Sequence, residues 1–344
     1  MYGLSDSFAR NSKQAEKKEG EKMKKYTIRF AVSLLTVFIT AQSASAARLL
    51  IPVGQVIGLE IKEDRVTIEG FANQAGDAAR AAGLKEGDRI LSIDGKDIHC
   101  PEDVRLALQH SDGDVDISVA RGSTVKELEL EPSITADGPK LGIFLRQGIT
   151  GVGTVTYYDP DSKTFGALGH GVNDKSGDLV VMTQGAAYAA TVDAVKKGKA
   201  GDPGQLMGSV TNREPIAALS KNTLQGVFGK AEFPFRGDVL PTADISQIQT
   251  GPAVIRSTIQ NGTVQEYSVE IMKIYPHSSA DGRNMLLKVT DPRLLDTTGG
   301  IVQGMSGSPI IQGGKLVGAV THVLVNDPTT GYGIFIENML DAAA

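Results

Sequence analysis

The residues best suited to chemistry in this chain are a serine and a histidine, each set between glycines. Ser306 lies in the run Gly304-Met305-Ser306-Gly307, shortly before an apolar segment that begins at Ile310. Glycines at such a turn let the backbone adopt positive φ and let a substrate carbonyl approach without a Cβ in the way. Backbone N–H groups of the turn would then converge beside the hydroxyl as an oxyanion hole. The segment therefore predicts a nucleophile loop, and a plain hairpin turn is the alternative.

The best candidate for a general base is His170, which lies between Gly169 and Gly171 at the end of an apolar run that begins at Phe165. Histidine combines a near-neutral pKa with hydrogen-bond reach to a hydroxyl. Considered together with Ser306, His170 is favoured as the proton acceptor over a purely structural histidine.

Two carboxylates precede the serine, and spacing does not choose between them. Asp291 ends a strand-like segment and is followed by Pro292, whereas Asp296 lies in the approach to the nucleophile loop. Either would be able to orient the imidazole and stabilise its protonated form. Asp291 would equally serve as a helix cap. This chemistry requires no metal and no organic cofactor, so we expect none.

The composition limits the class of protein that must position these groups. The chain has 344 residues, forty glycines and a formal net charge of −5. This length is sufficient for two hydrophobic cores, and the glycine content favours a soluble, β-rich protein of two domains. No basic stripe appears after the first thirty residues, so nucleic-acid binding is not expected. Because Cys100 is the only cysteine, an internal disulfide is excluded.

The N-terminal residues carry an export pattern. Residues 1–22 are polar and charged, so we expect a disordered leader. Within residues 23–46, Lys24, Lys25 and Arg29 precede an apolar run, and the small residues Ala44-Ser45-Ala46 follow it. The apolar run is about a dozen residues, which is short for crossing a bilayer. A secretory signal peptide is therefore favoured over a membrane anchor.

Residues 50–132 have the pattern of a small binding module. Two short helical segments alternate with strand-like runs, and the stretch from Ala78 to Gly95 ends in an Asp-Gly turn. This stretch is similar to bacterial PDZ domains. The resemblance implies a groove in which a peptide adds as a further strand, with its terminal carboxylate held near Ile57, Gly58 and Leu59. The alternative is that these three residues only build the strand and its turn.

Residues 133–344 show short β-like runs broken by glycine about every ten residues, which predicts an antiparallel barrel or sandwich. The sequence Gly304-Met305-Ser306-Gly307-Ser308-Pro309 resembles the nucleophile loop of bacterial chymotrypsin-like serine proteases. Together with the PDZ-like module and the export signal, it resembles the SpoIVB-type serine peptidases. The most specific stretches are residues 165–171 and 298–312. The implied fold is mainly β: a PDZ domain followed by a chymotrypsin-like double β-barrel.

The resemblance also assigns roles within the site. It places the catalytic triad at His170, Asp291 and Ser306, and so prefers Asp291 to Asp296. The N–H groups of Gly304 and Ser306 would bind the oxyanion. Thr321 and His322 would lie in the strand that lines the specificity pocket, although a structural role for His322 is the alternative.

The biology implied by the resemblance is regulated proteolysis during sporulation. The enzyme would be exported into the space between the two membranes around the forespore. There it would cleave itself and the extracytoplasmic part of a membrane protein, so that an intramembrane protease processes a late sigma factor. A peptide or C-terminal tail would occupy the PDZ groove. The alternatives are an inactive PDZ adaptor and a quality-control protease of the cell envelope, which usually carries its PDZ domain after the peptidase.

Overall fold

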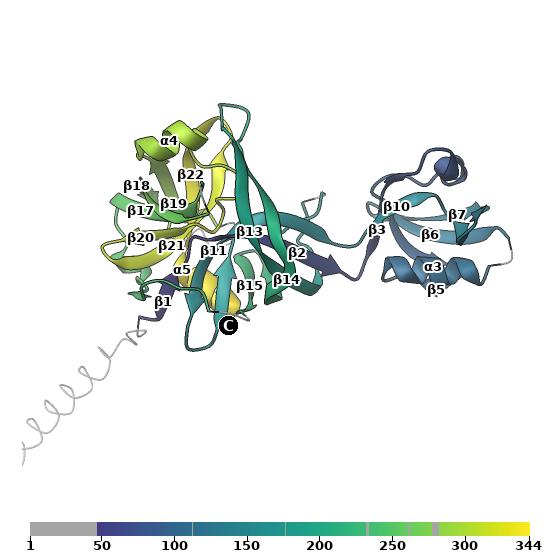
Figure 1. Cartoon of the computed structure of the whole chain (residues 1–344), viewed down its shortest axis with the longest axis horizontal. Helices are drawn as coiled ribbons and strands as arrows, with labels where there is room; N and C mark the ends of the chain where they lie inside the picture. Colours follow the sequence, from purple (N-terminus) through teal and green to yellow (C-terminus); the bar gives the residue numbers. More distant parts are fainter. Residues whose placement is uncertain (1–46, 112, 176, 232–233, 261, 277–281) are drawn as a thin grey trace, which may run out of the picture. The chain divides into compact units, whose positions relative to one another are not determined.

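The computed structural model describes residues 47–344, except residues 112, 176, 232–233, 261 and 277–281 (Figure 1). The expected leader (1–22) and signal segment (23–46) lie outside the described residues. Within the described part, none of the helices has the length and apolar character needed to span a membrane.

Six antiparallel strands close into a first barrel. They are β2 (Val56–Glu63), β11 (Ile149–Asp159), β12 (Thr164–Ala167), β13 (Met182–Lys196), β14 (Gln205–Thr223) and β15 (Gly226–Ala231). The ring closes because β12 pairs with both β11 and β15. Alternate residues of β2, Ile57, Leu59 and Ile61, point into the hydrophobic core of this barrel, as expected for a strand with one buried face. Two short strands, β1 (Leu49–Pro52) and β16 (Leu240–Pro241), extend the sheet beyond β11.

The second barrel is drawn in green to yellow in Figure 1. It contains β17 (Gly251–Thr258), β18 (Val264–Ile274), β19 (Met285–Val289), β20 (Pro309–Gln312), β21 (Lys315–Leu324) and β22 (Asp327–Phe335). A 3₁₀ turn, η2 (Ile245–Gln247), precedes it, helix α4 (Pro292–Thr298) follows β19, and helix α5 (Ile336–Ala343) follows β22.

The two barrels share one topology. When the strands of each barrel are numbered 1 to 6 along the chain, their order around the ring is 1-2-3-6-5-4 in both cases. This repeated antiparallel arrangement confirms the predicted fold class, a mainly β protein with a chymotrypsin-like double barrel.

A small domain is inserted between the first two strands of the first barrel. Its sheet has the order β10-β3-β4-β6-β7, with β5 beside β4, and its core is separate from those of the barrels. The elements are β3 (Val66–Phe71), η1 (Gln74–Gly76), α2 (Asp77–Ala81), β4 (Arg89–Ile93), β5 (Lys96–Asp97), α3 (Pro101–Gln109), β6 (Val115–Arg121), β7 (Thr124–Leu130), β8 (Ser133–Thr135), β9 (Gly138–Lys140) and β10 (Ile143–Arg146).

The observed boundaries correct the expected division at residues 50, 132 and 133. Strands β1 and β2 belong to the peptidase barrel, because β2 pairs with β11 and β13 along its whole length. Strand β10, by contrast, pairs with β3 of the small domain. The alternating pattern of residues 56–63 identifies a strand but not the sheet that it joins. Which sheet the strand joins depends on partner strands roughly a hundred residues away along the chain.

Candidate active site

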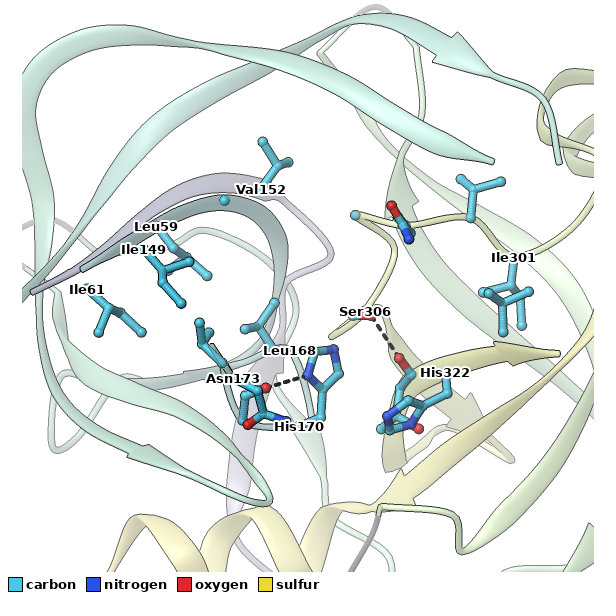
Figure 2. A pocket seen from close by; sticks show the side chains of 18 residues that line it. Leu59, Ile61, Ile149, Val152, Leu168, His170, Asn173, Ile301, Ser306 and His322 are labelled. Carbon is cyan, nitrogen blue, oxygen red and sulfur yellow. Dashed lines mark hydrogen bonds between the residues drawn. The ribbon is translucent and has the colours of Figure 1, made fainter. Parts of the chain in front are cut away.

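His170 and Ser306 lie in the lining of one cavity of about 510 Å³, shown in Figure 2. The first barrel contributes β2, the start of β11 and the segment after β12. The second barrel contributes residues 301–306 and strand β21. Apolar side chains form one wall of the cavity, among them Leu59, Ile61, Ile149 and Val152.

The two residues occupy equivalent places in the two barrels. His170 follows β12, which is the third strand of its barrel, and Ser306 lies between β19 and β20, the third and fourth strands of the other barrel. The shared topology therefore brings together two residues that are far apart along the chain.

The nucleophile loop is held against the first barrel by strand β11. The N–H of Thr154 donates to the carbonyl of Ser306 at 2.9 Å, and the Thr154 hydroxyl donates to the carbonyl of Gly304 at 2.8 Å. Gly307 has a φ of 96°, and a Cβ there would lie 2.0 Å from the Thr154 carbonyl oxygen. Only glycine fits this close approach.

The predicted oxyanion hole consists of two N–H groups of the loop, those of Gly304 and Ser306. The N–H groups of Met305 and Gly307 donate to the carbonyls of Val302 and Val320. The N–H groups of Gly304 and Ser306 have no acceptor among the residues that the structure describes. They are therefore available to a developing oxyanion beside the Ser306 hydroxyl.

His170 has the tautomer that a general base requires. Its Nδ1 lies 2.8 Å from the carbonyl oxygen of Gly171. A carbonyl only accepts, so Nδ1 carries the proton of the neutral ring and Nε2 keeps its lone pair. Burial lowers the pKa of His170, because the charged ring loses solvation, and the bond to the Gly171 carbonyl acts in the opposite direction.

The Ser306 hydroxyl is directed toward strand β21 in this structure. It donates to the carbonyl of Thr321 at 2.8 Å, the bond drawn as a dashed line in Figure 2. For His170 to accept the proton as predicted, the hydroxyl would have to leave this carbonyl.

Thr321 and His322 both line the cavity, where the sequence placed a candidate specificity pocket. The hydroxyl of Thr321 donates to the carbonyl of Gly282 at 2.9 Å, which ties β21 to the segment before β19. The rings of His322 and His170 face each other with centroids 5.2 Å apart. A substrate side chain entering beside His170 would therefore meet a second imidazole.

Asp291, the acid of the predicted triad, does not line the cavity of His170 and Ser306 and has other partners in this structure. Asp291 caps the N-terminus of α4 by accepting from the N–H of Arg293 at 2.9 Å, and it also accepts from the N–H of Ser268 and from the Arg293 guanidinium. Asp296 is exposed on the same helix. Neither carboxylate lines the cavity. The sequence motif Asp-Pro at a helix start, which permits a cap, explains Asp291 without catalysis.

The residues predicted to bind a peptide in the PDZ domain do not belong to that domain. Ile57, Gly58 and Leu59 lie in β2 of the first barrel, where they pair with β11 and β13. In the small domain, the equivalent pattern of an apolar residue, a glycine and an apolar residue is Leu141-Gly142-Ile143, which leads into β10. Strand β10 is at the edge of the sheet, beside β3. An extended peptide adds to such an edge.

The apolar wall from β2 and β11 was not predicted from the sequence. Its residues have no unusual chemistry, and they meet Ser306 only because the loop of the second barrel docks onto β11. The one local signal available was the run of glycines around Gly151 and Gly153, which permits close approach at a strand.

Two family models match the two parts of this architecture. A family model described as SpoIVB peptidase S55 matches residues 138–340, more than half of the chain, and a PDZ domain model matches residues 74–121. No curated protein matches the chain. Among solved structures, the chain is similar to the inactive form of the Rv3671c protease, at 14% identity and a TM-score of 0.33, over 57% of this chain and 85% of that one. An inactive serine-to-alanine mutant of Rv3671c from M. tuberculosis H37Rv matches at 14% identity and a TM-score of 0.31, over 57% and 82% of the two chains.

Proposed function

Since the chain belongs to the SpoIVB peptidase S55 family and is a serine peptidase, we propose that it is an exported endopeptidase that cuts the extracytoplasmic part of a membrane protein. The observation that carries the catalytic part of this proposal is the presence of His170 and Ser306 in one cavity.

The reaction follows from the groups in the cavity. The Ser306 hydroxyl leaves the Thr321 carbonyl, transfers its proton to Nε2 of His170 and attacks the peptide carbonyl. The N–H groups of Gly304 and Ser306 stabilise the negative charge on the carbonyl oxygen, by roughly 3 kcal/mol for each donor. The protonated His170 then gives its proton to the leaving amine. Water, activated by the same histidine, releases the acyl group from Ser306.

The proposed biological role is sporulation signalling. The enzyme would cleave a membrane regulator, and itself, in the space around the forespore, so that an intramembrane protease is activated and a late sigma factor is processed. Support comes from the sequence stretches 165–171 and 298–312, from the export pattern before residue 47, and from the matching family model. The PDZ domain would hold a peptide or C-terminal tail at β10.

The competing roles differ in measurable ways. An inactive adaptor would bind peptides without reacting with a serine-directed probe. A quality-control protease of the envelope would degrade many unfolded proteins, whereas a signalling protease would cut a few defined bonds. The PDZ insertion inside the first barrel differs from the usual envelope arrangement, in which the PDZ domain follows the peptidase.

The full chain treated with a fluorophosphonate probe tests the nucleophile. We expect one adduct, mapped by mass spectrometry to Ser306, and no adduct or self-cleavage in Ser306→Ala. Ser308→Ala is the matched control, because this neighbouring hydroxyl is buried and bonded to Ser257 at 3.1 Å. Self-cleavage that persists in Ser306→Ala, or labelling lost equally in both variants, would contradict the assignment.

A further inference from the structure

The carbonyl that orients His170 belongs to the next residue in the chain. The bond from Nδ1 to the Gly171 carbonyl at 2.8 Å occupies the position where a serine protease usually has a carboxylate. The direction of this carbonyl depends on the backbone of residues 171 and 172. Whatever fixes that backbone also fixes the tautomer and the direction of the His170 ring.

Asn222, near the end of β14, holds the backbone of residues 171 and 172 in place. Its Oδ1 accepts from the N–H of Val172 at 2.9 Å, while its Nδ2 donates to the carbonyl of Val172 at 2.9 Å and to the carbonyl of Val180 at 2.9 Å. The N–H of Val180 in turn donates to the Val172 carbonyl at 3.0 Å. One amide side chain thus holds both backbone polar groups of Val172 and ties them to a second segment.

The peptide before Val172 is also confined by packing. A Cβ on Gly171 would lie 2.3 Å from Cδ1 of Leu179 and 2.6 Å from the carbonyl oxygen of Thr223, the residue after Asn222. Gly171 therefore packs closely against the end of β14, and the Asn222 amide holds Val172 by hydrogen bonds. Together these contacts leave the Gly171 carbonyl little freedom to turn away from His170.

The residue type matches this task. The contacts require one acceptor and two donors in a single planar group, which asparagine supplies and aspartate does not. A carboxylate at this position would place an oxygen against the carbonyl oxygens of Val172 and Val180. Asn222 also lies outside the lining of the cavity, so it has no direct contact with a substrate there.

We propose that Asn222 is the positioning residue of this peptidase: it acts on His170 through Val172 and the Gly171 carbonyl, which takes the place of a triad acid. This inference rests on the Ser306–His170 peptidase site described above.

The test combines kinetics with nitrogen NMR of His170 in the full chain labelled with ¹⁵N-histidine. To keep the chain intact, all proteins for NMR also carry Ser306→Ala. We expect His170 to hold its proton on Nδ1 in the parent, and to populate the Nε2-protonated tautomer in Asn222→Ala. With Ser306 present, Asn222→Ala should lower kcat roughly a hundredfold, as expected for a misplaced catalytic group, and change KM much less.

Asn212→Ala is the matched control, because Asn212 lies exposed on the same strand and its side chain bonds only locally, to the N–H of Glu214 at 3.1 Å. It should leave tautomer and kcat unchanged. If Asn222→Ala does not fold, Asn222→Asp decides, because it keeps the acceptor for Val172 and loses both donor contacts. A loss of kcat in Asn222→Asp, together with a changed tautomer of His170, supports the proposal.

An unchanged His170 tautomer in the folded Asn222 variant would overturn the proposal, whether or not kcat falls, because a loss of stability alone does not move the proton between the ring nitrogens. The tautomer is measured without substrate, so a chain that cleaves no peptide still decides the role of Asn222. Failure of the peptidase assignment would appear separately, as the absence of probe labelling at Ser306 in the otherwise unaltered chain.

Discussion

At the scale of single residues, the burial of His170 affects the pH range in which it would act as the proposed base. Its ring must be neutral to accept the Ser306 proton, and burial lowers its pKa. The neutral form therefore persists further into acid than for a free imidazole. The imidazole of His322 lies beside that of His170, with ring centroids 5.2 Å apart.

The prediction concerns the acid limb of kcat/KM, whose midpoint should lie below about 6.5, the usual pKa of histidine. The measurement is a pH–rate profile with an excess of enzyme over an unstructured peptide. In His322→Asn the limb should remain below that value, because the cause is the burial of His170. A midpoint at or above the usual value would contradict the prediction.

Gly307 shows how a single missing Cβ permits the docking of the two barrels. Ala at this position would have its Cβ 2.0 Å from the Thr154 carbonyl oxygen and 2.5 Å from the N of Leu168, at a φ of 96°. Both contacts are with backbone of the first barrel, which cannot yield without moving β11 and the His170 segment.

We expect Gly307→Ala to abolish probe labelling and to lower the free energy of unfolding by more than about 3 kcal/mol, since a backbone clash adds to the strained φ. Gly313→Ala is the matched control, because Gly313 also has a positive φ of 57° but nothing lies within 4 Å of its added Cβ. That variant should lose only about 1 to 2 kcal/mol and keep its labelling. Equal losses of labelling and of unfolding free energy in the two variants would show that the close approach at Gly307 is unimportant.

At the scale of elements, helix α4 depends on its cap. Asp291 accepts hydrogen bonds from two backbone N–H groups and pairs with Arg293, and its side chain is only 6% exposed. The bonds from Arg293 are the main cause that lowers the pKa of Asp291 to about 2, and the backbone bonds add to them. The carboxylate form is therefore stabilised in the folded protein.

Asp291→Asn should lower the free energy of unfolding by about 2 kcal/mol at neutral pH, the equivalent of the pKa shift. Because the folded-state pKa is depressed, this stabilisation is complete above the unfolded value near 3.8 and is lost as the pH falls toward 2. Urea unfolding of both proteins between pH 7 and pH 2 measures it. The difference should disappear at the acid end.

The same variant, Asp291→Asn, distinguishes a helix-capping role of Asp291 from a catalytic role. Folded Asp291→Asn should keep kcat within about threefold of the parent, since catalytic acid–base effects are typically a hundredfold or more. Asp296→Asn, on the exposed side of α4, should change neither stability nor kcat. A collapse of kcat in Asp291→Asn without loss of stability would restore the acid of the predicted triad.

At the scale of the whole molecule, the PDZ domain is an insertion and not a preceding module. Glu63 ends β2, Ile149 begins β11, and the two strands pair with Ile61 opposite Ile149. In this register Glu63 lies opposite Gln147, so a two-residue turn would join them as a hairpin. The barrel can then close without the inserted domain.

Replacement of residues 64–146 by Asn-Gly should therefore leave a folded peptidase that labels at Ser306 and cleaves an unstructured peptide. Cleavage of the proposed membrane-protein substrate should fall more strongly, because the PDZ domain is proposed to hold it. Deletion of residues 50–132, by comparison, removes β2 and should give no folded barrel. The readouts are circular dichroism, probe labelling and the two cleavage rates. Loss of folding in the Asn-Gly variant would show that the insertion is structurally required.

The sequence by itself determined the mainly β class and singled out the two glycine-flanked residues, Ser306 and His170, that line one cavity. Glycine spacing, residue chemistry and alternating apolar residues are local properties. It also indicated a PDZ-like module from its helices and its Asp-Gly turn. Only the tertiary structure decided that residues 56–63 belong to the peptidase barrel, that Asp291 caps α4, and that Asn222 holds the His170 segment. The first and the third depend on hydrogen-bond partners about fifty to over a hundred residues away, which leave no mark in the local pattern. The sequence allowed a cap at Asp291, two residues from its partner Arg293, but did not choose between this role and the catalytic one.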